Sequence, residues 1–460
     1  MKFHNIQHIH FIGIGGSGMN GIAEVLINQG YRVSGSDLAD TEVTRRLASL
    51  GGKVYTGHSA DNLVDAQVVV VSSAVKAANV ELVAARERGI PVIQRAEMLA
   101  ELMRMKYGVA IAGAHGKTTT TSLVATVLGQ GGLDPTVVIG GRLNQYGSSA
   151  KLGNGQYMVA EADESDGSFL KLSPSLAVIT NLDREHLDFY ADMDAIRKAF
   201  ADFANKVPFY GAAILCLDDP EVQALMPHVH KRTITYGFNR QSDMRGDKLE
   251  LNTKGAHWEV SFRGQPLGVF RIPLTGRHNA QNAMAAICAG LELGISLDAI
   301  RTSLAGFSGV GRRFERKGET DGIIVVDDYG HHPTEVRATL SAARESFPDH
   351  RLLVIFQPHR YTRTRDQMEA FARAFHSADR LLLMDIYPAG EAPIEGITSA
   401  ALLDQIRACG HRDAHLVPDH AAVLEHLASQ AQSGDVILTL GAGDVVKLGP
   451  AFLAARKGEA

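Results

Sequence analysis

The clearest chemical signal in the chain is the run GAHGKTTTT, which extends from Gly113 to Thr121. An apolar segment precedes it and a helix-like segment follows, as in loops that bind nucleotide phosphates. Backbone N–H groups and Lys117 would hold the β- and γ-phosphates, and the Thr118 hydroxyl would ligate Mg²⁺. The run departs from the common pattern because Ile111 stands where the first glycine is expected. It predicts a nucleoside triphosphate site.

A second glycine-rich turn, GIGGSG, lies between a strand and a helix near the N-terminus. Its G-x-G-x-x-G spacing lets backbone N–H groups approach a diphosphate at the helix N-terminus. Asp37 follows Gly18 by 19 positions and could bind a ribose hydroxyl, so NAD fits this turn as well as another nucleotide diphosphate. The structural alternative is that the glycines serve only helix–strand packing. A dehydrogenase needs one such turn, so two favour a triphosphate together with a nucleotide-linked substrate.

Acidic and histidine side chains follow the next strand-like segments. Glu161 opens EADESD after an apolar run, where hard oxygen ligands suit Mg²⁺, and the alternative is a solvated acidic turn. His186 follows the next strand and could be a second metal ligand, although an isolated histidine is more often structural. Asn282, near the start of a helix, could bind adenine, or the asparagines there could cap the helix.

Two further strand ends carry polar side chains in the last third of the chain. They read DDYGHHP, from position 327, and QPHRYTRTR, from position 357. Carboxyl ends of neighbouring parallel strands form ligand-binding crevices. Arg360 and Arg363 could hold a carboxylate in bidentate fashion. Arg313, near an expected domain junction, could neutralise a transferring phosphate or simply add surface charge.

Strand-like runs that alternate with helix-like segments place these motifs in an α/β protein with mostly parallel sheets. We expect an N-terminal Rossmann-like domain over 1–106, a central P-loop ATPase-like domain over 107–313 and a C-terminal Rossmann-like domain over 314–460. The central domain should include a small β-rich part at about 232–273. The strands expected in the three blocks are 9–12, 32–36, 68–72 and 91–93; 107–112, 136–139, 157–160, 176–180 and 213–217; and 322–326, 351–356, 380–384 and 435–440.

Composition narrows the class of protein. The chain has 460 residues, a net charge of −5 and 45% hydrophobic residues, with no concentration of positive charge that would favour nucleic acid. Its three cysteines are far apart and form neither a disulfide framework nor a metal motif. We find no signal-peptide core and no apolar run of about 18 residues, so we expect a cytoplasmic protein that does not span a membrane.

Taken together, these motifs closely resemble the Mur ligases along essentially the whole chain. The matching pieces, which are highly specific together, are HFIGIGGSGMNGIAEVL, SGSD, VVVVSSAV, IPVIQRAEMLAELM, GAHGKTTTTSL, EADESDGSFL, NLDREHLD, GRHNAQNA, GRRFE, DDYGHHPTE and QPHRYTRT. The resemblance implies a UDP-substrate domain, a central ATPase domain and a mobile C-terminal domain. It also implies addition of L-alanine to the carboxylate of UDP-N-acetylmuramate, through an acyl phosphate, with release of ADP and phosphate in peptidoglycan precursor synthesis. ATP and Mg²⁺ would be required, Mn²⁺ could replace Mg²⁺, and the protein would be a monomer or homodimer.

The resemblance also implies roles for individual residues. The catalytic residues would be Lys117, His186, Arg313 and His331. ATP would contact Gly113, His115, Gly116, Lys117, Thr118, Thr119, Asn282, Arg313 and Asp328, the last through the ribose. The UDP substrate would contact Gly15, Gly16, Ser17, Gly18, Asp37, His58 and Ser72. Alanine and the reacting carboxylate would contact Tyr329, His331, His359, Arg360 and Arg363, and the metal ligands would be Thr118, Glu161 and His186.

One position departs from the family pattern. Several relatives carry a carbamylated lysine about fifteen residues after the metal-site histidine, where this chain has Ala201. Lys198 is near but out of register, so we do not expect carbamylation.

Three other interpretations remain to be distinguished. A recycling ligase would add a whole tripeptide to the same UDP sugar, although the GIGGSGM turn and the tyrosine of DDYGHHP favour the alanine-adding activity. An NAD-dependent oxidoreductase would use the first turn and leave GKTTTT unexplained. A non-catalytic nucleotide switch would bind ATP without turnover that depends on an amino acid.

Overall fold

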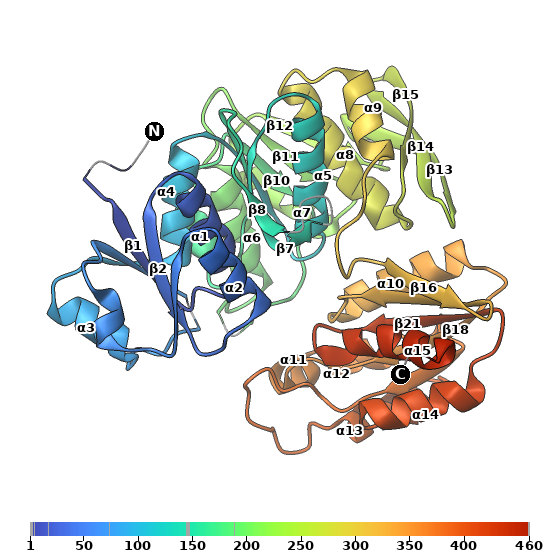
Figure 1. Ribbon diagram of the computed structural model, residues 1–460. Coiled ribbons are helices and arrows are strands. Elements are labelled where there is room, and N and C mark those ends of the chain that lie inside the picture. Colours follow the sequence, from blue (N-terminus) through green and yellow to red (C-terminus); the bar gives the residue numbers. More distant parts are fainter. Residues whose placement is uncertain are drawn as a thin grey trace. The chain divides into compact units, whose positions relative to one another are not determined.

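The computed structural model describes residues 3, 5–16, 18–72, 74–143, 148–187 and 189–458, with the backbone alone for 141–143 and 148–149. Within them the chain forms two compact units. The first contains the residues up to Lys248, Glu259–Phe270 and Gln281–Ser308, and the second contains Leu249–Trp258, Arg271–Ala280 and the residues from Gly309 onward. Each unit is described by itself below, and Figure 1 labels their helices and strands.

The N-terminal sheet has five parallel strands in the order β3-β2-β1-β4-β5. These strands are β1 (His8–Ile12), β2 (Arg32–Asp37), β3 (Lys53–Thr56), β4 (Val68–Val71) and β5 (Val92–Gln94). The helices are α1 (Met19–Asn28), α2 (Glu42–Ser49), η1 (Ala60–Leu63), α3 (Val80–Glu87) and α4 (Arg95–Arg104). Ile9 and Phe11 pack in one core with α1 and α4, whereas Ile12 packs in another with α3. Side chains alternate between the faces of a strand, so helices cover both faces of this sheet.

The central sheet has ten strands in the order β15-β14-β13-β12-β11-β10-β6-β9-β7-β8. From β13 to β7, each strand is parallel to the next one in this order, whereas the edge strand β8 is antiparallel to β7. The strands are β6 (Tyr107–Ala112), β7 (Thr136–Leu143), β8 (Ser148–Lys151), β9 (Tyr157–Glu161), β10 (Leu176–Ile179), β11 (Ala212–Cys216), β12 (Thr233–Gly237), β13 (Met244–Asn252), β14 (Gly255–Phe262) and β15 (Gln265–Ile272). The helices are α5 (Lys117–Gln130), η2 (Ser168–Lys171), α6 (Met193–Ala204), α7 (Pro220–Leu225), η3 (Met226–His228), α8 (Arg277–Glu292) and α9 (Leu297–Ala305).

The C-terminal sheet has six strands in the order β16-β17-β21-β18-β19-β20, and only β16 is antiparallel to its neighbour. The strands are β16 (Glu315–Thr320), β17 (Ile323–Asp328), β18 (Arg351–Phe356), β19 (Arg380–Leu383), β20 (Ala414–Leu416) and β21 (Asp435–Leu440). The helices are α10 (Pro333–Ser346), α11 (Tyr361–Asp366), α12 (Met368–Ala372), α13 (Ser399–Ala408), α14 (His420–Gln430), η4 (Asp444–Lys447) and α15 (Leu448–Lys457). Alternate residues of β18 pack either with α10 and α13 or with α14 and α15, so this sheet is also covered on both faces.

The structure confirms the predicted α/β fold with three mostly parallel sheets. Three predicted strands, 107–112, 351–356 and 435–440, match the observed bounds. The prediction missed the strands β3, β8, β16 and β20. These strands are short or rich in polar residues, as in KVYT and ERKGET, so they lack the apolar run by which the buried strands were found. Among the described residues, no helix is both long and apolar enough to cross a bilayer.

Candidate active site

The predicted phosphate loop connects β6 to α5, so it lies at the carboxyl end of a central strand. Gly113 has φ +140°, and a Cβ there would lie 2.0 Å from Thr180 Oγ1. Gly116 has φ +80°, and a Cβ would lie 2.8 Å from Asn282 Oδ1. Glycine is therefore required at both positions, because any side chain would meet a neighbour as well as left-handed strain. Asn282, predicted to contact ATP, lies beside this loop.

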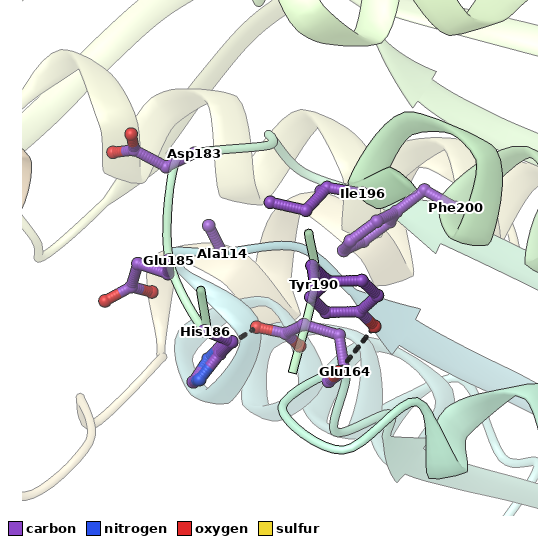
Figure 2. Close-up of a pocket in the computed structure, with 8 residues that line it drawn as sticks. All are labelled: Ala114, Glu164, Asp183, Glu185, His186, Tyr190, Ile196 and Phe200. Atoms are coloured by element: carbon purple, nitrogen blue, oxygen red, sulfur yellow. Dashed lines mark hydrogen bonds and ion pairs between the residues drawn. The ribbon is translucent and has the colours of Figure 1, made fainter. Parts of the chain in front are cut away.

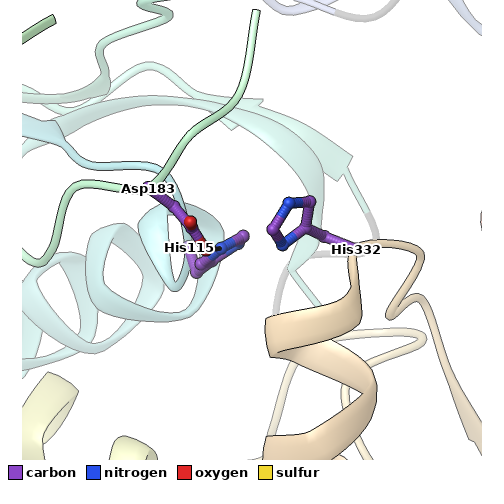
Figure 3. A group of neighbouring side chains, drawn as sticks. All are labelled: His115, Asp183 and His332. Carbon is purple, nitrogen blue, oxygen red and sulfur yellow. Dashed lines mark hydrogen bonds and ion pairs between the residues drawn. The ribbon is translucent and has the colours of Figure 1, made fainter. Parts of the chain in front are cut away.

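The loop is held from the neighbouring strand β10. Asn181 Oδ1 accepts a hydrogen bond from His115 N at 2.8 Å, and Thr180 Oγ1 donates to His115 O at 2.7 Å. His115 Nε2 lies 2.8 Å from Asp183 Oδ2, and Figure 3 draws both side chains. The sequence prediction included His115 but missed these partners, although Asn181 and Asp183 belong to the same motif, NLDREHLD, as His186. Their contacts fix the loop backbone before a nucleotide binds.

Lys117 is the first residue of α5, and its ammonium group is saturated by acceptors. Nζ donates to Glu164 Oε1 at 2.7 Å and to the carbonyl oxygens of Gly113 and Ala114 at 2.5 and 3.1 Å. Burial opposes the charged form, but the adjacent Glu164 carboxylate outweighs it and raises the pKa of Lys117. The lysine is therefore a fixed cation at the N-terminus of α5, as a phosphate-binding residue should be. The prediction did not include Glu164.

Thr118 and Glu161 form a pair of hard oxygen donors. The Thr118 hydroxyl lies 3.1 and 3.2 Å from the two carboxylate oxygens of Glu161, which ends the adjacent strand β9. Gly140 N donates to the same carboxylate at 2.8 Å. A hydroxyl and a carboxylate beside a phosphate loop suit Mg²⁺, which prefers oxygen ligands and substrate phosphates. The residues present therefore fit the predicted ion.

His186 belongs to a neighbouring group. Its Nε2 lies 3.7 Å from Glu164 Oε1, and ligand atoms of Glu164, Glu185 and His186 all lie within 4.8 Å of one another. Figure 2 shows these side chains around a pocket that Tyr190 and Phe200 also line. Burial lowers the pKa of His186, but Glu164 and Glu185 raise it by more, so the pKa lies above its ordinary value.

The predicted metal ligands thus lie in two neighbouring groups. Thr118, which follows Lys117 in the chain, pairs with Glu161, whereas His186 lies with Glu164, which bonds Lys117. Lys198 instead lies on the surface of α6, with 78% of its side chain exposed, and pairs with Asp202 at 2.8 Å. Ala201 is buried on the same helix.

The N-terminal glycine turn connects β1 to α1. Asp37 Oδ2 accepts a hydrogen bond from Gly15 N at 2.9 Å, so the predicted ribose ligand also fixes the turn. Gly18 has φ +76° at the N-cap of α1, and Gly16 N bonds Gly13 O at 3.1 Å. Ser17, also predicted to bind the UDP substrate, lies outside the described residues. Gly18 thus places the N-terminus of α1, where backbone N–H groups favour anionic ligands, directly after the turn.

His58 and Ser72, which are also predicted to contact the UDP substrate, lie at the same sheet edge. Ser36 Oγ is 2.9 Å from His58 Nδ1 and also bonds the buried carboxylate of Glu81 at 2.5 Å. Burial would raise the pKa of Glu81, but hydrogen bonds from His10, Ser36 and Asn62 hold it at about 2. Ser72 follows β4, which pairs with β1, and its N–H donates to Ile12 O at 3.4 Å. The charged Glu81, which the prediction missed, thus orients His58.

Arg95 is another residue that the sequence prediction missed. Its Nη1 lies 2.7 Å from the position that a Cβ on Gly18 would occupy. Its Nη2 donates to Asp163 Oδ2 at 2.8 Å, in the acidic segment after β9. A guanidinium therefore lies between the N-terminal glycine turn and the acidic edge of the central sheet. The only signal in the sequence was its position in the quoted run IPVIQRAEMLAELM.

In the second unit, Arg313 lies between two residues with strained backbones. Arg312 has φ +61° and Phe314 has φ +48°. The guanidinium groups of Arg312 and Arg313 lie 4.9 and 5.0 Å from the centre of the Tyr329 ring, so this ring orients both arginines. Asp328 accepts hydrogen bonds from Phe314 N and Gly330 N, each at 2.8 Å, and its burial raises its pKa despite nearby Arg313.

The remaining predicted residues of this unit lie together at the ends of β17 and β18. The ring centroids of Tyr329 and His331 are 5.2 Å apart, and those of His331 and His359 are 6.0 Å apart. Arg363 Nη1 donates to His359 O at 3.1 Å. Burial, His331 and Arg363 lower the pKa of His359 to about 3, so its imidazole is neutral at pH 7. His332, also drawn in Figure 3, caps α10 by accepting from Thr334 N at 3.3 Å.

Comparisons with known proteins agree with this geometry. Three family models match, described as the Mur ligase family catalytic domain (residues 8–107), the Mur ligase middle domain (111–290) and the Mur ligase glutamate ligase domain (312–443). UDP-N-acetylmuramate–L-alanine ligases from Geobacter sp. (strain M21) and Anaeromyxobacter sp. (strain Fw109-5) are 56% and 58% identical, and each match covers 97% of both chains.

Solved structures extend the likeness to the fold. The UDP-N-acetylmuramate–alanine ligase of Thermotoga maritima superposes with a TM-score of 0.84 at 29% identity, over 98% of this chain and 100% of that one. A murein peptide ligase from Psychrobacter arcticus has the same fold, with a TM-score of 0.72 at 24% identity, over 98% of each chain. With family models along most of its length and near-complete relatives above half identity, the chain belongs to the Mur ligase family.

Proposed function

We propose that this protein is an ATP-dependent ligase that adds L-alanine to the carboxylate of UDP-N-acetylmuramate. The observation that carries the proposal is the phosphate loop, in which Lys117 lies at the same sheet edge as the Thr118–Glu161 pair. Curated relatives named for this activity are 55–58% identical over nearly the whole chain, which supports the choice of substrates. The reaction would take place in the cytoplasm, in peptidoglycan precursor synthesis.

The chemistry requires activation of a carboxylate. A carboxylate and an ammonium group do not condense at neutral pH, so the carboxylate oxygen first attacks the γ-phosphorus of ATP and ADP leaves. The free amine of alanine then attacks the carbonyl carbon of the acyl phosphate, and the tetrahedral intermediate expels phosphate. The protein contributes positioning and neutralisation of negative charge.

The central residues would perform the first step. Lys117, already held as a cation, binds the β- and γ-phosphates and withdraws negative charge from the phosphoryl group as it transfers. Thr118 and Glu161 would hold Mg²⁺, or Mn²⁺ in its place, which supplies charge neutralisation at the phosphates. His186 would lie near the acyl phosphate, where the neighbouring glutamates raise its pKa and so favour its charged form, or it would support a second ion.

The flanking regions would bind the other reactants. We propose that residues 1–106 hold the UDP group on the turn that contains Gly15, Gly16 and Gly18, that 107–313 hold ATP, and that 314–460 bind alanine and part of ATP. Tyr329 would keep Arg313 in place for the γ-phosphate. The neutral imidazole of His359 leaves Arg360 and Arg363 as the cations that attract a carboxylate. Asp328 remains a proposed ligand of the ATP ribose.

The first test is phosphate release with ATP, Mg²⁺ and UDP-N-acetylmuramate, with and without L-alanine. We expect release that requires both substrates and is lost in Lys117→Ala, with Lys198→Ala as the matched surface control. A solved ligase from Neisseria meningitidis, 30% identical over 67% of this chain, is named for the tripeptide L-alanyl-γ-D-glutamyl-meso-diaminopimelate, so this tripeptide is the alternative acceptor. Release with the tripeptide but not with alanine would move the assignment to the recycling activity, and no release with either would refute both.

A further inference from the structure

The residue with the least usual backbone in the proposed alanine site is Arg360. It has φ +72° and ψ +139°, a region that residues with a side chain rarely occupy. Such a conformation costs on the order of 1–3 kcal/mol and persists only where surrounding contacts enforce it. Arg360 is also half exposed, since 50% of its side chain is accessible. The backbone is therefore constrained while the guanidinium group remains accessible.

The enforcing contacts come from a segment about thirty residues further along the chain, 385–396. Tyr387 N donates to Pro358 O, and Arg360 N donates to Tyr387 O, each at 2.8 Å. These two bonds form a single parallel bridge between His359 and Tyr387 outside the named strands. The rings of His359 and Tyr387 also stack, with centroids 5.5 Å apart and an interplanar angle of 9°. Tyr387 thus fixes both the backbone and the ring that precede the strained residue.

Glu391, from the same segment, fixes the other side of Arg360. Its carboxylate accepts Thr362 N at 3.0 Å and the Thr362 hydroxyl at 2.7 Å. Its Oε1 lies 4.0 Å from Arg360 Nη1, which is an ion pair but too long for a hydrogen bond. Burial would raise the pKa of Glu391, but the Thr362 bonds and Arg360 lower it, so the group is ionised at pH 7. Its charge can orient the guanidinium without using the N–H donors that a ligand would need.

We propose that the segment 385–396 is a positioning clamp for the acceptor amino acid: Tyr387 and Glu391 hold Arg360 so that its guanidinium receives the carboxylate of alanine. This inference rests on the proposed function and extends it to two residues that contact Arg360 and Thr362 rather than the reacting atoms. A preorganised guanidinium loses less conformational freedom when it binds, so the clamp should appear as affinity for one substrate.

The kinetic test compares Glu391→Ala and Glu391→Gln with Glu369→Gln. Glu369 pairs with Arg373 at 2.8 Å on the surface of the same unit, so it is a matched ion-pair control. We expect KM for L-alanine to rise about tenfold in Glu391→Ala, with kcat and the KM values for ATP and UDP-N-acetylmuramate unchanged within about twofold, because binding common to ground and transition states is lost. Glu391→Gln should lie between, since its amide oxygen still accepts from Thr362 but carries no charge. The control should match the unchanged protein.

Amide hydrogen exchange of the same proteins without substrates tests the clamp directly. Residues 360–364 should exchange faster in Glu391→Ala and not in Glu369→Gln. Faster exchange with an unchanged KM for alanine would reduce Glu391 to a structural role and overturn the proposal. A raised KM without faster exchange would also overturn it, because Glu391 would then act on the substrate itself. If the unchanged protein does not turn over with alanine, the proposed function and this assignment of the acceptor fail together, while exchange still decides whether the clamp exists.

Discussion

Replacing Glu164 by glutamine should destabilise the nucleotide-free protein, because Glu164 is the carboxylate that holds the Lys117 ammonium at 2.7 Å. Only 4% of the Glu164 side chain is exposed, against 17% for Lys117, so water compensates little for the lost charge. Breaking a buried ion pair by removing one partner typically costs about 3–5 kcal/mol. Three features of this site reduce that figure.

The first is that Lys117 keeps its bonds to the carbonyl oxygens of Gly113 and Ala114. The second is that the glutamine amide oxygen can still accept a hydrogen bond from the charged ammonium group, so only the attraction between opposite charges is lost. The third is that Glu161 and Glu185 also favour the charged lysine. We therefore expect a loss of about 1–2 kcal/mol, which in a domain of 150–250 residues lowers the thermal midpoint by about 2–8 °C.

Differential scanning calorimetry measures this change. Added ATP raises the midpoint of the unfolding transition of the part of the chain that binds it, and the midpoint of that same transition is then compared between the proteins without nucleotide. The matched control is Asp202→Asn, which breaks the exposed Lys198–Asp202 pair and should cost less than about 0.5 kcal/mol. Equal shifts in the two variants would refute the reasoning, because they would mean that Lys117 and Glu164 do not form a buried pair in solution. An increase in stability in Glu164→Gln would refute it as well.

Three further predictions concern separate parts of the site. Thr118→Val keeps the shape of the side chain but removes a hydroxyl that fits Mg²⁺, so the Mg²⁺ concentration for half-maximal phosphate release should rise at least tenfold; an unchanged value would exclude it as a ligand. Gly116→Ala should raise the Kd for ATP, measured by calorimetric titration, more than tenfold. Gly264→Ala is the control, because Gly264 has the same φ of +80° but open space around it, and the Kd should be unchanged. The pKa of His359 is depressed to about 3, so the stability that its neutral form contributes is complete above pH 6.5 and is lost as pH falls toward 3. Between pH 7.5 and 5, His359→Gln should therefore lose less free energy of unfolding than the unchanged protein, by on the order of 1 kcal/mol. Parallel curves of thermal midpoint against pH for the two proteins would contradict this.

The parts of the site that could be predicted from sequence share one property: each follows directly from the end of a buried parallel strand. The loop after β6, Glu161 after β9 and Asp328 at the end of β17 all belong to this class. A run such as VAIA or IIVV identifies the strand, and parallel strands bring their carboxyl ends to one edge. The chemistry of the residue that follows then indicates its role.

The residues that sequence reasoning missed act across large separations without a local pattern. Arg95 reaches Asp163 over 68 positions, and Asn181 reaches His115 over 66. A single arginine after a short edge strand, or an asparagine beside a quoted histidine, has the same local appearance as many surface residues. Which of them becomes a partner depends on the order of strands in the sheet. That order was not predicted from hydrophobic periodicity, which identifies strands but not their neighbours.

Backbone strain occurs where residues predicted from sequence meet partners that the prediction missed. Of the described residues with positive φ other than glycine, four adjoin or belong to the predicted functional set, namely His186, Arg312, Phe314 and Arg360. Phe314 is held by the Asp328 carboxylate, Arg312 N by Glu315 at 2.7 Å, and Arg360 by Tyr387 and Glu391. These three strained positions thus each have a partner whose removal would let the backbone relax toward an ordinary conformation. The motif supplies the reactive side chain, and carboxylates and carbonyl oxygens elsewhere in the fold supply the free energy that keeps it in a conformation that its own sequence disfavours.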